Sequence, residues 1–395
     1  MPICGIIAEY NPFHNGHMRH LALAKTQTSA EAVICVMSGH FVQRGEPAIL
    51  RKQARTRAAL LHGADIVLEL PVPYATASAE RFASAAVEIF SACGIVDTLC
   101  FGSESGDLSA LTATARSLAN ESPAFQSRLQ AALAAGHSFP AARDKAAEGT
   151  AFLTMPNDIL GVEYIKAILR QNASITPHTI KREGSDYHDK AIIGTIASAT
   201  AIRHALANNT TWSSAMPQSA AAILLSECDA HCAPITLDHF SQAFLYSLRT
   251  TPTEALACRA DIAEGLENRI LRCAEDHASL SAIATAVKTK RYTHTRIQRA
   301  LLHILLQINA EDSAAPAPYI RVLGFRRDSE AILRQLYASA TLPVVTNLKN
   351  ARALLNDNAF RTLEIECRAT DIYRTAAQSL GGRMNSEWHE PMVMV

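Results

Sequence analysis

The feature that most constrains the fold of this 395-residue chain is an apolar strand followed at once by a turn and a helix. Residues 3–8 are apolar, which is typical of a strand buried on both faces. The turn residues Asn-Pro-Phe-His-Asn-Gly at 11–16 end that strand. The apolar spacing within residues 17–25 then predicts a helix. A buried strand of this kind needs helices on both faces of its sheet, which favours an α/β fold.

The same alternation continues along the first half of the chain. Short apolar runs predict further strands at 32–37, 66–70, 96–101 and 174–181. Helical periodicity lies between and after them, at 51–62, 79–92, 107–135, 157–169 and 198–207. This order predicts a Rossmann-like, doubly wound parallel sheet. The strand pattern fades after Asn209, so we expect an α/β domain at 1–210 and a mostly helical domain at 211–395.

Composition limits the kinds of partner. Lys and Arg together number 37, as do Asp and Glu, so the formal net charge is zero. Without a strongly basic overall field, an RNA-binding surface has to be a local patch. The chain opens without a secretory signal and has no apolar run long enough to span a bilayer, so we expect a cytoplasmic protein.

The nine cysteines are odd in number and scattered, which argues against a disulfide framework. Cys228 and Cys232, with His231 between them, lack the second ligand pair of a zinc site. We therefore interpret them as free thiols and predict no metal site.

Three unusual loops follow strands of the predicted sheet, at residues 9–17, 38–47 and 101–104. In open α/β sheets, ligands bind outside the carboxyl ends of the strands. The loops should therefore meet at one binding site. The middle loop, with Gly39 and Gly45 as candidate hinges, is a candidate shield against water.

The first of these loops contains His14-Asn15-Gly16-His17, which joins a strand to a helix. Backbone N–H groups and the dipole at a helix start favour an anion such as phosphate, and Gly16 permits close approach. His14 and His17 can donate hydrogen bonds to charge that develops during attack on phosphorus. We predict that both are catalytic; the alternative is that they only cap the helix.

A second candidate phosphate contact lies at a later helix start. Ser198 is placed as the helix N-cap, and Arg203 lies about one and a half turns further on. Together they could hold the outer phosphates of a nucleotide. The alternative is an ordinary capped helix with a surface arginine.

These motifs resemble known families. The His14-x-Gly16-His17 turn resembles the nucleotidyltransferase superfamily, and the segment at Ser198 resembles its late I-S-S-T-x-I-R element, with Ala197 and Ala199 as departures. Longer strings, up to about residue 325, resemble the bacterial tRNA(Met) cytidine acetate ligase family. They lie at residues 9–17, 37–48, 101–104, 157–161, 180–182, 264–270 and 289–293.

The resemblance implies a two-step reaction. Acetate attacks the α-phosphate of ATP, which gives acetyl-adenylate and pyrophosphate. The N4 amine of the wobble cytidine in elongator tRNA(Met) then takes the acetyl group. ATP is a substrate, and Mg²⁺ is expected with it although no carboxylate is assigned. The implied ATP contacts are Ile7, Asn11, Pro12, Phe13, His14, Asn15, Gly16, His17, His20, Gly102, Asn157 and Arg182.

Two of these residues carry no such signal by themselves. Asn157 has the pattern of a helix N-cap, and Arg182 that of a solvated charge at a strand end. Two other functions also stay open at this stage. One is an adenylyltransferase for a different small acid or phosphate ester, and the other is a non-catalytic tRNA-binding protein.

A basic stretch in the second half is the candidate RNA surface. Basic and aromatic residues together suit phosphate contacts and base stacking. The resemblance to a tRNA-modifying family favours tRNA as the partner. The predicted contacts are Lys288, Lys290, Arg291 and Arg296, beside Arg299, Tyr292 and His294, with Arg321, Arg326 and Arg327 adding to the stretch.

Overall fold

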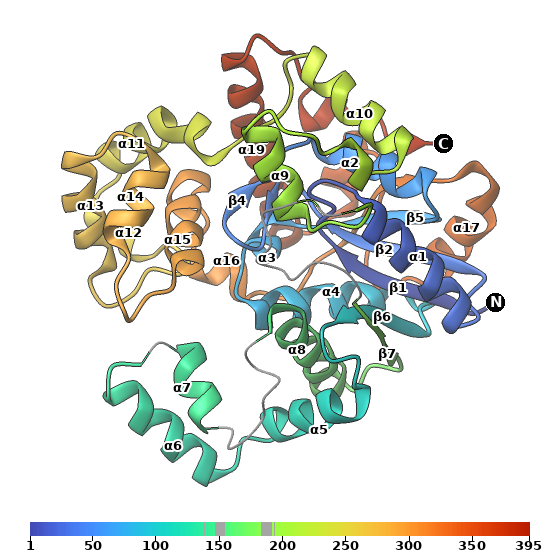
Figure 1. Ribbon diagram of the computed structural model, residues 1–395, viewed down its shortest axis with the longest axis horizontal. Coiled ribbons are helices and arrows are strands. Elements are labelled where there is room, and N and C mark those ends of the chain that lie inside the picture. The colour runs from blue at the N-terminus through green and yellow to red at the C-terminus, as the bar shows by residue number, and fades with distance from the viewer. Residues whose placement is uncertain (138, 147–154, 183–191, 193) are drawn as a thin grey trace.

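An eight-stranded sheet forms the centre of the computed structural model (Figure 1). The structure describes residues 1–137, 139–146, 155–182, 192 and 194–395. The strand order is β10-β8-β5-β2-β1-β6-β7, with β9 paired to β8. The strands are β1 Ile3–Ala8, β2 Ala32–Ser38, β5 Ile66–Leu70, β6 Thr98–Ser103, β7 Thr176–Lys181, β8 Ile320–Phe325, β9 Val344–Val345 and β10 Val393–Met394.

The first five strands of this sheet along the chain are those predicted from the sequence. β1 and β5 have the predicted bounds, whereas β6 begins two residues later than predicted, at Thr98. The pairs β1–β2, β1–β6, β2–β5 and β6–β7 are all parallel, which confirms the doubly wound α/β fold. Their carboxyl ends therefore point to the same edge of the sheet.

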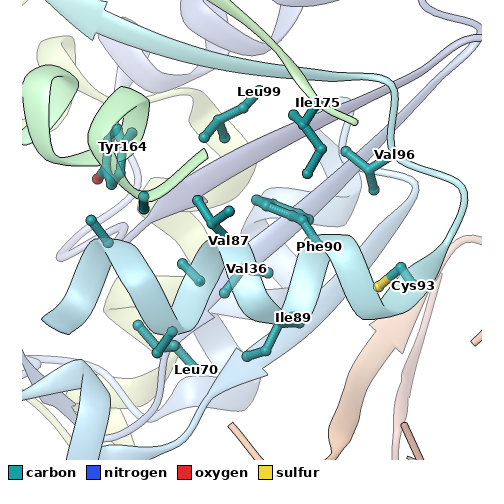
Figure 2. Close-up of a cluster of buried hydrophobic side chains, with 14 of the residues drawn as sticks. Val36, Leu70, Val87, Ile89, Phe90, Cys93, Val96, Leu99, Tyr164 and Ile175 are labelled. Atoms are coloured by element: carbon teal, nitrogen blue, oxygen red, sulfur yellow. The ribbon is translucent and has the colours of Figure 1, made fainter. Parts of the chain in front are cut away.

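Helices cover both faces of the sheet. Successive residues of β2 point to opposite sides: Ile34 packs in one core and Cys35 in the other. Figure 2 shows the first core, where Phe90 of α4 lies among strand side chains such as Val36 and Leu99. The helices of the first half are α1 Asn15–Gln27, α2 Lys52–Leu61, α3 Val72–Ala75, α4 Ala79–Cys93, α5 Leu108–Ala119, α6 Pro123–Ala134, α7 Phe139–Ala146, α8 Pro156–Gln171 and α9 Ala199–Ala207.

The predicted helix at 107–135 is in fact two helices, α5 and α6. Ser122 caps the second one by accepting a hydrogen bond from the backbone N–H of Phe125, and Pro123 is its first residue. Proline suits that position because it has no N–H to leave unpaired, but it interrupts a continuing helix.

The second half is mostly helical, as predicted, and its helices pack around a further core that Phe41 and Val72 of the first half also enter. Its helices are α10 Gln218–Asp229, α11 Ser241–Thr250, α12 Thr253–Ala257, α13 Leu266–Asp276, α14 Leu280–Val287, α15 His294–Leu306, α16 Ala310–Ala314, α17 Glu330–Ser339, α18 Ala351–Leu354 and α19 Asp357–Ser379. None of the described helices is both long and apolar enough to cross a membrane.

Three strands, β8, β9 and β10, lie beyond Asn209, where the strand pattern of the sequence fades. Strand β8, at Ile320–Phe325, joins the sheet antiparallel to β5, and β10 pairs with β8. All six residues of β8 are buried. A short apolar run of this length cannot be distinguished from a buried helix segment by periodicity alone.

Candidate functional site

A cavity of about 510 Å³ opens at the carboxyl ends of β1, β6 and β7. Residues from all three predicted loops line it, which confirms that the loops meet at one place. Most of the predicted ATP contacts line it as well. These are Ile7, Asn11, His14, Gly16, His17, His20, Gly102, Asn157, Arg182, Ser198 and Arg203.

Pro12, Phe13 and Asn15 do not line the cavity and instead shape the turn beside it. The Phe13 ring is buried and stacks on His62, with 5.0 Å between ring centroids. The Asn15 amide donates to the carbonyl oxygens of Thr195 and Ser214, at 2.7 and 2.9 Å. These bonds fasten the start of α1 to the segments on either side of α9.

The two histidines of the first loop stack on each other, with 3.6 Å between ring centroids. The backbone N–H of His14 donates to Nδ1 of His17 at 3.3 Å. Because Nδ1 accepts this bond, the proton of a neutral His17 ring sits on Nε2. Gly16 makes room for the pair, since a Cβ there would lie 2.9 Å from the His14 ring. His14 is also the residue that precedes α1, so the same histidines hold the helix start and line the cavity.

Electrostatics in the cavity favour an anion. Burial, then the positive charge of Arg182 and Arg203, lowers the pKa of His14 to about 3. Burial also lowers the pKa of His20 to about 4, with Arg182 as the next cause, and lowers that of His17. The histidines are therefore neutral hydrogen-bond donors at neutral pH, while the two arginines supply the positive charge.

The start of α9 forms one wall of this cavity. Ser198 Oγ accepts a hydrogen bond from the backbone N–H of Ala201 at 3.1 Å, which confirms the predicted N-cap. Arg203 donates to the backbone carbonyl of Asn11 at 2.8 Å and to Thr200 Oγ1 at 3.4 Å. Arg203 therefore faces the cavity and is not a free surface charge.

Asn157 is not the N-cap that its local pattern indicates. Helix α8 begins at Pro156 with Met155 before it, so Asn157 is the second helical residue. The carboxylate of Glu104 accepts hydrogen bonds from the Asn157 side chain at 2.6 Å and from the backbone N–H of Asp158 at 2.9 Å. Sequence reasoning did not single out Glu104, although it directly follows β6 in the Gly-Ser-Glu string.

Gly102 makes room for Arg182 beside this helix start. A Cβ at Gly102 would lie 3.2 Å from Cγ of Arg182, which is tighter than ordinary contact. Arg182 follows directly after β7 and its backbone N–H donates to Ser103 at 2.8 Å. Arg182 is exposed at the strand end, as its local pattern indicates, and it also lines the cavity.

The loop at 38–47 is packed tightly against the second half of the chain. It contains a short hairpin, β3 Phe41–Val42 and β4 Glu46–Pro47. A Cβ at Gly39 would lie 2.8 Å from carboxylate oxygens of both Glu69 and Glu366. Gly45 has φ of +77°, and a Cβ there would lie 2.4 Å from the backbone nitrogen of Arg299. Both glycines thus permit close packing, and the hinge interpretation is not supported.

The cavity is also lined by residues that the sequence analysis did not single out. Glu9, Gln43, Arg44 and Glu46 line it from the loops after β1 and β2. Thr295, at the start of α15, lines it from the second half. The basic stretch therefore runs up to the rim of the same cavity.

Part of that stretch is exposed and part is not. Lys288, Lys290 and Arg291 are exposed, and Arg291 pairs with Glu264 at 2.7 Å. The Arg296 guanidinium lies over the buried ring of Tyr292, 4.8 Å from its centroid, so that ring is not free to stack on a base.

The structure corrects two other members of the stretch. Arg299 is buried and pairs with Asp261 at 2.8 Å. Arg321 is buried beside Glu387, at 3.4 Å. Neither of them belongs to an RNA surface.

Known proteins resemble this chain over nearly its whole length. The family model described as HIGH Nucleotidyl Transferase matches residues 1–387. The tRNA(Met) cytidine acetate ligase of Acetivibrio thermocellus is 41% identical over 392 residues, and the match covers 94% of each chain. That of Caldicellulosiruptor saccharolyticus is 44% identical over 381 residues, again with 94% of each chain covered.

Solved structures agree with these relatives. The crystal structure of Thermotoga maritima TmcAL bound with α-thio ATP superposes with a TM-score of 0.93 at 34% identity. The apo form of the same protein superposes with a TM-score of 0.95, and both matches cover 100% of each chain. The chain therefore belongs to the HIGH nucleotidyl transferase family and, within it, to the tRNA(Met) cytidine acetate ligases.

Proposed function

We propose that this protein activates acetate with ATP as acetyl-adenylate, releasing pyrophosphate, and transfers the acetyl group to N4 of the wobble cytidine of elongator tRNA(Met). The observation that carries the proposal is the cavity at the sheet edge, where His14, His17 and Arg182 converge. Its support is similarity over 94% of the chain to ligases named for tRNA(Met).

In the first step the side chains position ATP and stabilise charge. An acetate oxygen attacks the α-phosphorus, and pyrophosphate leaves in line with it. His14 and His17 donate to the phosphate oxygens as their charge grows, while Arg182 and Arg203 neutralise it. We propose Ile7, His20, Gly102, Asn157 and Ser198 as further ATP contacts because they line the same cavity.

Magnesium is expected to arrive with ATP. Among the described residues no group of three His, Cys, Asp or Glu side chains could hold a metal ion. Mg²⁺ commonly binds through substrate phosphates and water with few protein ligands, which fits this cavity. Bound there, it would neutralise part of the phosphate charge.

In the second step the tRNA approaches from the side of α15. Lys288, Lys290, Arg291 and Arg296 precede or begin this helix, and Thr295 lines the cavity. Phosphate contacts from this stretch would place an anticodon base at the cavity mouth. We therefore propose residues 211–395 as the tRNA-binding part and 1–210 as the catalytic part of a cytoplasmic enzyme.

The test is acetate-dependent modification of the tRNA. Protein, ATP, acetate and unmodified elongator tRNA(Met) are incubated, and the tRNA is digested to nucleosides for mass analysis. N4-acetylcytidine should form only when ATP and acetate are both present. The proposal would be refuted if no N4-acetylcytidine forms and if AMP is released at the same rate with and without acetate. Pyrophosphate exchange with a panel of acids and phosphate esters would then show whether the protein is another adenylyltransferase. Binding of tRNA with no AMP release would instead indicate a non-catalytic tRNA-binding protein.

A further inference from the structure

The cavity is lined by cationic and neutral donors and by two carboxylates. Histidines and arginines gather around the turn after β1 and the start of α9, where phosphates fit. Glu9, Gln43, Arg44 and Glu46 line the cavity from the loops after β1 and β2, and Thr295 lines it from the start of α15. Of the described residues that line the cavity, Glu9 and Glu46 are the two with carboxylates. A carboxylate repels the bare phosphates of ATP, so in this cavity it can either hold Mg²⁺ beside them or accept a proton from the other substrate.

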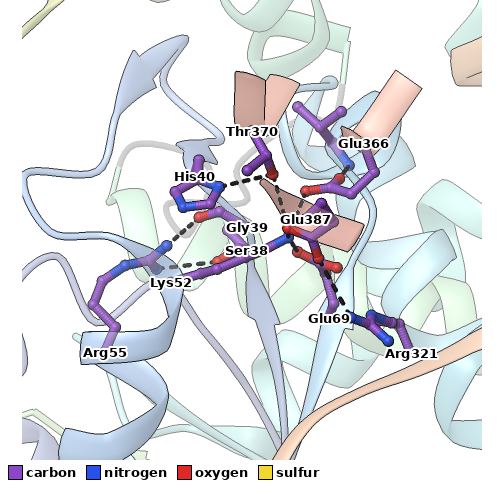
Figure 3. Close-up of polar contacts among 11 residues, drawn as sticks. Ser38, Gly39, His40, Lys52, Arg55, Glu69, Arg321, Glu366, Thr370 and Glu387 are labelled. Atoms are coloured by element: carbon purple, nitrogen blue, oxygen red, sulfur yellow. Dashed lines mark hydrogen bonds and ion pairs between the residues drawn. The ribbon is translucent and has the colours of Figure 1, made fainter. Parts of the chain in front are cut away.

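The backbone of Glu9 is held in place by a buried arginine. Arg55 donates from Nη1 to the carbonyl oxygen of Glu9 at 2.6 Å. The same guanidinium donates to the carbonyl oxygens of Ser38, at 3.1 Å, and Gly39 (Figure 3). Arg55 therefore joins the ends of β1 and β2 and fixes where the Glu9 side chain begins.

The side chain of Glu9 is fixed at one oxygen. Oε1 accepts the backbone N–H of Gln43 at 2.9 Å, and the Gln43 amide is itself anchored to the carbonyl of Ala77 at 3.2 Å. No hydrogen bond to Oε2 comes from the described part of the chain. Glu46, by contrast, accepts a bond from the Gln298 side chain at 3.1 Å, which ties it to α15.

Acetyl transfer needs a proton acceptor. When N4 of cytidine attacks the acetyl carbon, a new C–N bond forms and the nitrogen becomes positively charged and acidic. The carbonyl then re-forms, the bond from carbon to the adenylate oxygen breaks, and AMP leaves with that electron pair. One N4 proton has to go to a base for acetylcytidine to be released neutral.

We propose that the carboxylate of Glu9 accepts this proton, an inference that rests on the proposed function. Among the histidines, His17 uses Nδ1 to accept the backbone N–H of His14, which leaves Nε2 as a donor. Glu9 lies directly after β1, on the same turn that carries those histidines. Glu9 therefore lines the same cavity as those histidines, and its backbone carbonyl and Oε1 are held in place by hydrogen bonds.

The test separates the two half-reactions in the full-length protein. Glu9→Gln keeps an oxygen that can accept the Gln43 N–H but removes the proton-accepting charge. Acetate-dependent ATP–pyrophosphate exchange should stay within about threefold of wild type. Single-turnover transfer from acetyl-adenylate to unmodified elongator tRNA(Met) should fall by about 10²–10⁴-fold, the usual contribution of a general base.

Glu46→Gln is the matched comparison, because it neutralises the other carboxylate of the cavity. Its transfer defect should be at least tenfold smaller than that of Glu9→Gln. Added formate should partly restore transfer by a Glu9→Gly variant supplied with preformed acetyl-adenylate.

Provided that the wild-type protein makes acetylcytidine, three outcomes would overturn the inference. The first is near-normal transfer by Glu9→Gln, and the second is an equal loss of exchange and transfer in Glu9→Gln. The third is a transfer defect in Glu46→Gln as large as that in Glu9→Gln. If wild type makes no acetylcytidine, the proposed function itself fails.

Discussion

The backbone N–H of His14 donates to Nδ1 of His17, and the two imidazole rings stack 3.6 Å apart. This contact sets the proton of His17 on Nε2, the nitrogen left to donate to a phosphate oxygen. It also explains the spacing of the motif, since residues three apart lie on one face of the first helical turn. Gly16 is required because the His14 ring occupies the space of a side chain there.

His17→Ala should slow adenylate formation by about 10²–10³-fold, the usual scale for one preorganised donor to a developing charge. Acetate-dependent pyrophosphate exchange measures the rate, and circular dichroism measures the folded fraction. The catalytic role would be refuted if the variant unfolds while its activity per folded molecule stays normal.

Acid should destabilise the protein through its buried histidines. The pKa of His14 is about 3 in the folded state, against about 6.5 in an unfolded chain. Below pH 6.5 His14 binds a proton in the unfolded state but not in the folded state. The free energy of unfolding therefore falls as the pH drops toward 4. The slope is about 1.4 kcal/mol per pH unit for each such histidine.

Urea unfolding at several pH values checks this expectation. The His14→Gln variant should lose less stability than wild type between pH 6.5 and 5, whatever its stability at pH 7. Equal slopes for the two proteins would show that His14 titrates normally.

Arg203→Lys should raise the KM for ATP by about 10–100-fold, since a charged hydrogen bond contributes about 1.5–3 kcal/mol. Lysine keeps the charge but cannot reach both the Asn11 carbonyl and Thr200 as the planar guanidinium does. Pyrophosphate exchange at varied ATP concentration gives KM. An unchanged KM would place Arg203 outside the ATP site.

Lys52 is the centre of a buried ion cluster that joins the two halves of the chain (Figure 3). Its Nζ lies 2.5 Å from Glu69, 3.2 Å from Glu366 and 3.0 Å from Glu387. Lys52→Met should cost about 3–5 kcal/mol of stability, because it leaves buried carboxylates without their shared cation. Denaturant unfolding measures the loss.

Glu69→Gln is the matched variant for that cluster. Burial, followed by the negative charge of Glu366, raises the pKa of Glu69. A neutral amide at this position leaves Lys52 paired with Glu366 and Glu387. Glu69→Gln should lower the free energy of unfolding by less than half as much as Lys52→Met does. A larger cost would mean that Glu69 has to be charged.

Arg291→Ala should weaken tRNA(Met) binding and reduce the slope of its salt dependence by about 1, as expected for one lost phosphate contact. Glu264→Gln removes the acid that pairs with Arg291 and should strengthen binding slightly. Filter binding at several salt concentrations measures both. A salt slope that does not change in Arg291→Ala would exclude it from the RNA surface.

The sequence by itself determined the parts of this protein that depend on neighbours along the chain. The bounds of β1 and β5, the turn with His14 and His17, and the cap at Ser198 all follow from local apolar runs, turn residues and capping chemistry. The meeting of the three loops also followed, because parallel strands bring their carboxyl ends to one edge.

Only the tertiary structure decided which distant residues become partners. Arg299 pairs with Asp261 and Arg321 with Glu387, 38 and 66 residues apart, so two arginines that look like an RNA surface are buried ion pairs. Likewise Glu104 reaches α8, and β8 enters the sheet from beyond residue 300. No local pattern encodes such pairings, because they depend on how the complete chain packs.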